Sequence, residues 1–181
     1  MKISRLAVGD MTATESSSSY LAPPQMAQDL HLDGMPLGTR GGMKITHYFP
    51  LDALYDLNIE GRFRARGRSP LNVELDVTID GVSVETDNGY LSQIPLTAGA
   101  HTITAAIIDL RKTSGVNDIY REYSVGGNIN RIEIIGPFNA ISPGNTPSRQ
   151  QVFSCYPATN DEQIPCAQTI VEDVASRAFR A

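Results

Sequence analysis

The segment richest in side chains that can bind a ligand runs from Asp109 to Glu122. It combines oxygen ligands, an aromatic ring and a cation within fourteen positions: Asp109, Asn117, Asp118, Tyr120, Arg121 and Glu122. Carboxylate and amide oxygens bind calcium or sugar hydroxyls, and a tyrosine ring stacks on the apolar face of a sugar. These six residues are the candidate ligand-binding set, with Asp109 and Asp118 as candidate calcium ligands. The alternative is a solvated polar loop in which Asp109 pairs with Arg111 or Arg121.

Signatures of catalysis are missing from the sequence. It contains no Gly-x-Ser-x-Gly elbow, no phosphate-binding Walker loop and no Cys-x-x-Cys-His motif for haem attachment. The histidines at 31, 47 and 101 are too scattered to suggest a metal triad. We expect His47 to be a hydrogen-bonded core residue and His101 a surface residue. We therefore predict no catalytic activity and no haem in this chain, against a rival enzyme that uses Asp109, Glu122 and His101.

The two cysteines, Cys155 and Cys166, lie eleven positions apart on either side of a loop. A disulfide between them would stabilise the tail of the chain by about 3 kcal/mol, judged from loops of similar length. Free thiols in a cytosolic protein are the alternative. The local spacing in a cysteine-poor chain favours the disulfide, and a disulfide implies an exported protein, periplasmic or secreted.

Secondary-structure elements must position these candidate residues. The alternation of apolar and polar residues in the middle of the chain predicts β-strands. Val73, Leu75, Val77 and Ile79 alternate with polar residues, and Asp80-Gly81 supplies a two-residue turn. Similar patterns cover residues 43–49, 55–59, 82–84, 91–96, 101–110 and 129–135, the last closed by a Gly-Pro pair. About seven short strands, with no helix of about ten residues between them, predict an all-β antiparallel sandwich of jelly-roll type.

The two ends of the chain differ from the middle. Residues 1–28 are expected to form a helix stub ended by Gly9 and then an aperiodic, Ser- and Pro-rich linker that is extended or mobile. The sandwich module is expected over residues 29–140. Residues 141–181 are expected to form a loop and a C-terminal helix that packs on the rim or projects, as the start of a following helical domain. That helix has apolar residues at helical spacing: Ile164, Ala167, Ile170, Val171, Val174 and Ala178.

Composition limits the partners. The chain has 181 residues and a net charge of −5, with 15 Lys and Arg against 20 Asp and Glu, and it has no basic block. Such a chain is a poor nucleic-acid binder. It has no apolar run near the ~20 residues that a membrane span needs. Trp is absent, so a sugar site would rely on tyrosine for stacking.

A glycine-rich stretch precedes the first predicted strand. Arg40 in this stretch is a candidate for binding a carboxylate or phosphate. The adjacent pair Gly41-Gly42 favours instead a close backbone approach or a bulge.

Three segments carry a resemblance to a known class of protein. They are Ile-Ser-Arg-Leu-Ala-Val-Gly-Asp at 3–10, Gly-Met-Pro-Leu-Gly-Thr-Arg-Gly-Gly-Met at 34–43 with His-Tyr-Phe-Pro-Leu-Asp at 47–52, and Thr-Pro-Ser-Arg at 146–149 with both cysteines and Ala-Ser-Arg-Ala-Phe-Arg at 175–180. In this order they resemble large exported planctomycete-type proteins built from domains of unknown function and cytochrome c modules. The resemblance implies a β-sandwich insert followed by the first helix of a helical domain. It places the haem-bearing modules outside this chain.

Residues 99–136 resemble calcium-dependent xylan-binding modules. The resemblance rests on Gly-Ala-His-Thr-Ile at 99–103, on Asp109, and on Asn-Arg-Ile-Glu-Ile-Ile-Gly at 130–136. In that family an Asn-Asp pair and a later Asp-Arg-Asn-like stretch hold calcium beside the sugar. Here Asp109 matches the first acid, Ile108 replaces its Asn, and Asn117-Asp118 is the available substitute for the later stretch.

Together these patterns predict a non-catalytic carbohydrate-binding module of an exported multidomain protein. The implied partner is a polysaccharide, xylan-like or another plant or algal glycan, with calcium as the implied cofactor. The alternative is a structural spacer that positions neighbouring helical and cytochrome c domains.

Overall fold

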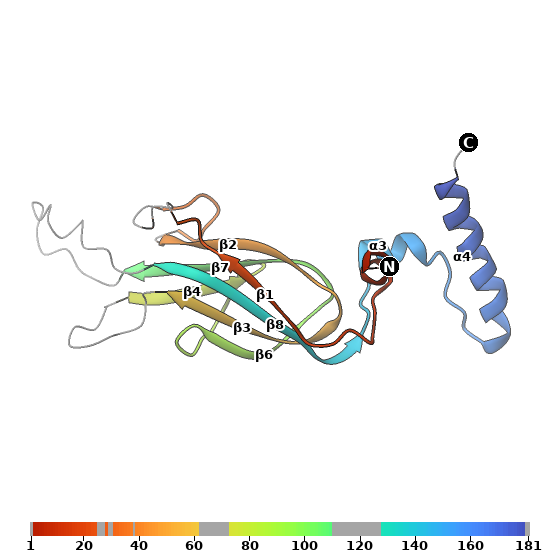
Figure 1. Cartoon of the computed structure of the whole chain (residues 1–181), viewed down its shortest axis with the longest axis horizontal. Coiled ribbons are helices and arrows are strands. Elements are labelled where there is room, and N and C mark those ends of the chain that lie inside the picture. Colours follow the sequence, from red (N-terminus) through yellow and green to blue (C-terminus); the bar gives the residue numbers. More distant parts are fainter. Residues whose placement is uncertain are drawn as a thin grey trace, which may run out of the picture.

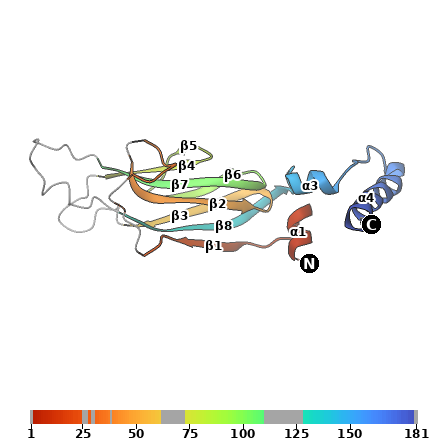
Figure 2. The same ribbon diagram turned by 90° about the horizontal axis from the view of Figure 1, so that it is seen from above.

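The structure is a computed structural model, and it describes residues 2–24, 28, 31–37, 39–61, 73–109 and 128–179. In this part of the chain, eight strands form two four-stranded antiparallel sheets (Figures 1 and 2). The first sheet has the order β1 (Ser16–Leu21), β8 (Ile129–Ser142), β3 (Asp52–Gly61), β6 (Tyr90–Leu96). The second has the order β2 (Arg40–Phe49), β7 (Gly99–Asp109), β4 (Val73–Ile79), β5 (Val82–Val84). Each sheet interleaves strands from distant parts of the sequence, which confirms the predicted jelly-roll sandwich.

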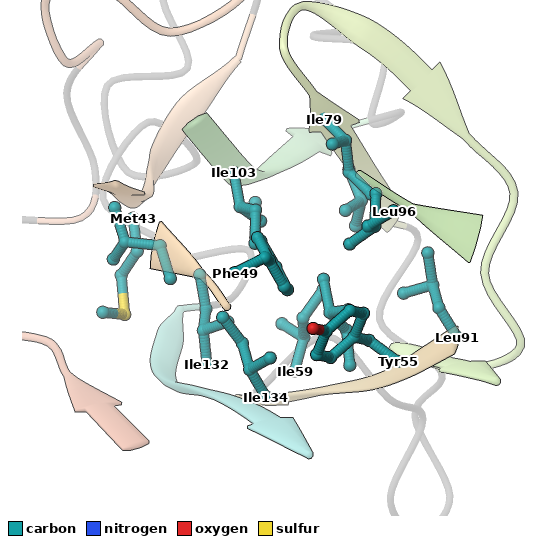
Figure 3. Packing of buried hydrophobic residues seen from close by; sticks show 14 of the residues in the cluster. Met43, Phe49, Tyr55, Ile59, Ile79, Leu91, Leu96, Ile103, Ile132 and Ile134 are labelled. Atoms are coloured by element: carbon teal, nitrogen blue, oxygen red, sulfur yellow. The ribbon is translucent and has the colours of Figure 1, made fainter. Parts of the chain in front are cut away.

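The core lies between the two sheets and is built from the alternating apolar residues that the sequence predicted (Figure 3). Phe49 and Tyr55 are its largest fully buried side chains, with their rings edge to face at 4.6 Å. The Tyr55 hydroxyl donates a 2.9 Å hydrogen bond to the Leu51 carbonyl, so its one polar atom is satisfied. His47 is half-buried and hydrogen-bonds the Tyr20 hydroxyl through Nδ1 at 2.8 Å, as expected of a core histidine.

The register between β4 and β7 decides what faces outward. Val77 lies opposite Ala105 and Thr78 lies opposite Thr104. Because side chains alternate along a strand, the valine and alanine enter the core while the two threonines point away from it. The turn after β4 has positive φ at both Asp80 (51°) and Gly81 (81°), which confirms the predicted two-residue turn.

The predicted N-terminal linker is extended as expected at Ser16–Leu21, but this segment is part of the sandwich, as strand β1 at the edge of the first sheet. β1 pairs antiparallel with β8, from Ser16 opposite Gly136 to Leu21 opposite Arg131. The serine run has no apolar alternation, since only Tyr20 packs against the core. Backbone hydrogen bonds to β8 therefore make this strand, and such bonds leave no side-chain pattern in the sequence.

The last strand also extends further than predicted. It was expected to close at Gly136-Pro137, but β8 continues to Ser142. Gly136 has φ 145°, and a Cβ added there would lie 2.5 Å from the Tyr55 ring. The glycine therefore lets β8 pass close to a buried ring within one strand, rather than ending it.

The glycine pair in β2 has the structural role that the sequence favoured. The pairing of β2 with β7 shifts register between Arg40 and Met43, and Gly41 and Gly42 have φ values of 60° and 105°. A Cβ added to Gly41 would lie 2.5 Å from the Gln28 carbonyl oxygen. The pair is therefore a bulge with close backbone contacts on both sides.

The N-terminal helix α1 (Lys2–Val8) lies beside α3 (Pro147–Val152), at one end of the sandwich (Figure 2). The Arg149 guanidinium donates to the Val8 carbonyl and also stacks over the Phe153 ring at 4.4 Å. Gly9 ends α1 with φ 76°, the left-handed conformation expected of a helix-ending glycine. Parts of two of the segments that carry the first resemblance, residues 3–10 and 146–149, therefore meet in space.

Helix α4 (Gln163–Ala178) follows the short 3₁₀ turn η1 (Asn160–Glu162) and projects away from the sandwich (Figure 1). A disulfide joins Cys155 to Cys166 and confirms the predicted pairing. Cys166 is also the buried residue of α4, so the disulfide is what anchors this helix to the preceding loop. Within the described residues, no helix has both the length and the apolar character needed to cross a membrane.

Candidate functional site

The ligand-binding set predicted from the sequence begins at the end of β7. Asp109 is the last residue of that strand and pairs with Val73 of β4. The loop after it lies outside the described residues, and with it the rest of the set: Asn117, Asp118, Tyr120, Arg121 and Glu122. That these residues bind a sugar or calcium stays a prediction from the sequence.

The described residues form a groove elsewhere, on the outward face of the second sheet. Its volume is about 660 Å³, within the range of small-molecule binding sites. The outward face of β2, β7 and β4 makes its floor, residues 34–36 make one wall, and the β4–β5 turn makes the other. The lining residues are Gly34, Met35, Pro36, Lys44, Thr78, Asp80, Gly81, Thr102 and Thr104.

Three threonines form the floor. Thr78 and Thr104 face each other across the β4–β7 pair, with their Oγ1 atoms 2.7 Å apart, and each is only 6% exposed. Thr102 lies two residues before Thr104 and so points to the same face. The floor therefore presents one close pair of hydroxyls across the two strands, with the Thr102 hydroxyl beside it on β7.

The wall formed by residues 34–36 is held by its own hydrogen bonds. The Met35 amide donates to the Leu32 carbonyl at 3.1 Å, and the Thr39 hydroxyl donates to the Pro36 carbonyl at 2.7 Å. The Met35 side chain is only 7% exposed and packs over Gly42. The segment therefore packs against β2 and borders the sheet face that carries the outward threonines.

Asp80 is the carboxylate that lines the groove. Its Oδ1 accepts the Thr102 amide at 2.8 Å, and its Oδ2 accepts His101 Nδ1 at 2.5 Å. Partial burial acts to raise the pKa of Asp80, but the hydrogen bonds from Thr102 and His101 outweigh it and hold that pKa below its ordinary value. Asp80 is therefore an ionised acceptor at neutral pH.

The prediction that His101 is a surface residue is wrong. Its side chain is 15% exposed, its ring lies edge to face with Phe49 at 5.4 Å, and Nε2 lies 2.9 Å from the Thr97 carbonyl oxygen. The residue sits at the start of β7, where core packing on one side and Asp80 on the other enclose it. His101 therefore fixes the position of the Asp80 carboxylate.

Lys44 supplies the cation of the groove. Its side chain is exposed, and its Nζ lies next to Gly34, where an added Cβ would come within 2.8 Å of it. It forms no hydrogen bond or ion pair with any residue in the described ranges. The groove thus has hydroxyls on its floor, a carboxylate at one side and an unpaired ammonium at the other.

This set of groups suits the binding of a ligand rich in hydroxyls. Threonine hydroxyls both donate and accept, an ionised carboxylate accepts, and an ammonium donates. Across the described part of the chain, no cluster of three or more His, Cys, Asp or Glu side chains could hold a metal ion. The sequence reasoning missed the groove residues, although Thr78, Thr102 and Thr104 occupy the outward positions of two predicted strands.

Comparison with the models of known protein families, with curated proteins and with solved structures finds no match to this chain. The resemblances to multidomain cytochrome c proteins and to xylan-binding modules therefore stay hypotheses from the sequence.

Proposed function

We propose that this chain is a non-catalytic carbohydrate-binding module of an exported protein. The observation that carries the proposal is the groove on the second sheet, with Thr78, Thr102 and Thr104 on its floor and Asp80 at its side. Sugars present rows of hydroxyl groups, and hydroxyl, carboxylate and ammonium groups pair with them directly. The disulfide supports export to the periplasm or the medium, because such bonds persist in oxidising compartments.

The floor is rigid, which favours binding of a ligand in one orientation. Thr78 and Thr104 lie on central strands β4 and β7, and their hydroxyls are already oriented by the bond between them. Tyr48 lies on the same face of β2 as Lys44 and is 38% exposed, so it offers an aromatic ring beyond the groove. With few aromatic contacts we expect a Kd on the order of 0.1–1 mM, or about 4–5.5 kcal/mol.

A glycan array followed by titration calorimetry, each with and without millimolar calcium, tests the proposal. The double variant Thr78→Val/Thr104→Val removes both hydroxyls of the buried pair, so it leaves no unpaired partner behind. We expect it to weaken glycan binding about thirtyfold, since it removes two hydroxyls that each contribute about 1 kcal/mol of hydrogen bonding. Thr169→Val on α4 makes the same chemical change far from the groove and should leave binding unchanged.

Two other results would revise the proposal. If Asp109→Ala or Tyr120→Ala abolishes binding while the threonine variant does not, the sugar binds the predicted loop and not the groove. If calcium is then required, the predicted ligands Asp109 and Asp118 gain support. If no glycan binds the chain under any condition, the carbohydrate-binding proposal is wrong.

One observation favours the second candidate, a structural spacer. Helix α4 projects from the sandwich and carries exposed apolar side chains at Ile164 (71%), Val171 (66%) and Val174 (40%). With Ala167 and Ala178 they follow three- and four-residue spacing along one side of the helix. The occupant that fits this stripe is an amphipathic helix of a neighbouring domain in the same parent protein. Protection of the α4 stripe from hydrogen exchange when that domain is present would support the spacer.

A further inference from the structure

We propose that the groove selects an anionic sugar unit, a uronate or a sulfated sugar, and that Lys44 recognises its charge. This inference rests on the proposed function and names the class of glycan. It comes from a difference between the two charged groups that line the groove.

Asp80 has its partners within the protein. Both of its carboxylate oxygens accept hydrogen bonds, from the Thr102 amide and from His101 Nδ1. Lys44 has none among the residues that the structure describes, although its Nζ lies beside Gly34 at the wall of the groove. An incoming anion can therefore pair with Lys44 without displacing an existing partner.

The geometry places that anion at one end of a hydroxyl row. The register sets Lys44 opposite Thr104, and Thr104 opposite Thr78, so the three side chains cross the sheet in one line. Two strand spacings separate the backbones of Lys44 and Thr78, about 9.6 Å across the sheet. A ligand that contacts both residues therefore extends across β2, β7 and β4.

The chemistry of lysine sets the breadth of the selection. Its ammonium is a compact point charge with three rotatable donors. It can therefore donate hydrogen bonds equally well to a planar carboxylate and to a tetrahedral sulfate. Arginine at this position would favour bidentate geometry. β2 is an edge strand of its sheet, so a longer polysaccharide can continue past the groove on that side.

The experiment measures binding of the whole chain to oligogalacturonate and to its methyl ester, which keeps the hydroxyls and loses the charge. A sulfated galactose oligosaccharide and its desulfated form make the second pair. We expect each anionic ligand to bind at least about tenfold more tightly than its neutral form, in line with a charge-assisted hydrogen bond. The preference should fall as salt rises from about 0.01 M to about 1 M.

Variants at position 44 assign the preference to one side chain. Lys44→Met keeps the aliphatic stem and removes the charge, so it should abolish the preference while leaving binding of the neutral forms within about twofold. Lys44→Arg should restore the preference. Arg177→Met on α4 changes the net charge equally at an exposed site and should have no effect.

The outcomes separate this inference from the proposed function. If neutral and anionic glycans bind equally, or if the preference survives Lys44→Met, the inference is overturned and carbohydrate binding stands. If the preference instead depends on Arg121, the charge is recognised by the predicted loop, and the inference is also overturned. If no glycan binds wild-type protein, the proposed function itself fails.

Discussion

The β-sandwich and helix α4 are both amphipathic in sequence, yet their apolar residues have opposite environments. In the sandwich, buried residues from six of the eight described strands meet in one cluster in which Phe49, Leu57 and Ile103 are fully buried (Figure 3). On α4, Ile164 and Val171 are mostly exposed and only Cys166 is buried. Burial of apolar surface therefore stabilises the sandwich, whereas a covalent bond holds α4.

This difference separates the two candidate functions. The groove lies on strands whose inner faces are packed in the core, and hydrogen bonds hold its threonine pair and Asp80 in place. α4 presents an apolar stripe without a described partner, which suits docking to another domain. Substitutions in the two regions should therefore have very different effects on stability.

The largest effect is expected from Phe49→Ala in the core. Phe49 is fully buried and its ring contacts those of His47, Tyr55 and His101. Its removal leaves a cavity and should lower the free energy of unfolding by about 3–5 kcal/mol. Urea unfolding followed by circular dichroism measures this change.

The matched control is Phe179→Ala, after the end of α4, where the ring is 83% exposed. It should change the free energy of unfolding by less than about 0.5 kcal/mol. Equal losses from the two phenylalanine substitutions would contradict the contrast between the regions.

The disulfide gives the second largest effect, and one confined to the tail. The double variant Cys155→Ala/Cys166→Ala should destabilise α4 by about 3 kcal/mol, the value for loops of similar length. An unattached helix of 16 residues is marginal in water, so helical signal should be lost. Hydrogen exchange should quicken in α4 and stay slow in β7. A comparable loss of protection in β7 would show that α4 supports the sandwich.

The third effect is a pH dependence that arises in the sandwich alone. Burial lowers the pKa of His47 below its ordinary value of 6.5. The unfolded chain then binds a proton at a higher pH than the folded chain does. The stability is therefore fully present above about pH 6.5 and falls as the pH drops toward the folded-state pKa, by at most about 1.4 kcal/mol per pH unit.

Unfolding in urea at several pH values between about 7.5 and 5 measures this slope. His47→Gln should flatten it, because the amide does not titrate and can still hydrogen-bond the Tyr20 hydroxyl. A slope that persists in His47→Gln would assign the pH dependence to another group.

The smallest effect is expected from Val171→Glu in the apolar stripe of α4. The side chain is 66% exposed, so the substitution should change the free energy of unfolding by less than about 0.5 kcal/mol. If a neighbouring domain docks on this stripe, as the spacer proposal requires, the same change should weaken that docking. A large destabilisation of the isolated chain would mean that α4 packs on the sandwich in solution.

Much of the fold could be predicted because burial leaves a period-two pattern in the sequence. Val73 to Ile79 alternates cleanly, and Asp80-Gly81 marks its turn, so both were predicted correctly. Strand β1 was missed because it is held by backbone pairing at a sheet edge, which requires no alternation. The end of β8 was misplaced because a Gly-Pro pair usually marks a turn, while here it lies within a strand.

The candidate site shows where pattern reading fails. Side chains that can bind a ligand cluster in the sequence after Asp109, and this clustering predicted a site there. The groove instead joins Lys44, Thr78 and Thr104, which are separated by 34 and 26 positions and meet only through the pairing of β2, β7 and β4. The alternation of side chains along each strand predicts that these three residues point outward. It does not predict which strands are neighbours in the sheet.

The amino-acid sequence by itself determined the class of the fold, the composition of its core, the helical tail and the cysteine pair that anchors it. Each of these follows from the local spacing of residues in the sequence. The spacing of apolar residues decides which side chains one face of a strand or helix can bury, and the short loop between the cysteines allows them to pair. Only the tertiary structure decided that residues 34–36 and three threonines line one groove, that His101 hydrogen-bonds Asp80, and that Lys44 is left unpaired among the described residues. Those contacts join residues far apart in the chain, and long-range strand order is set by the packing of the whole sandwich rather than by any one segment.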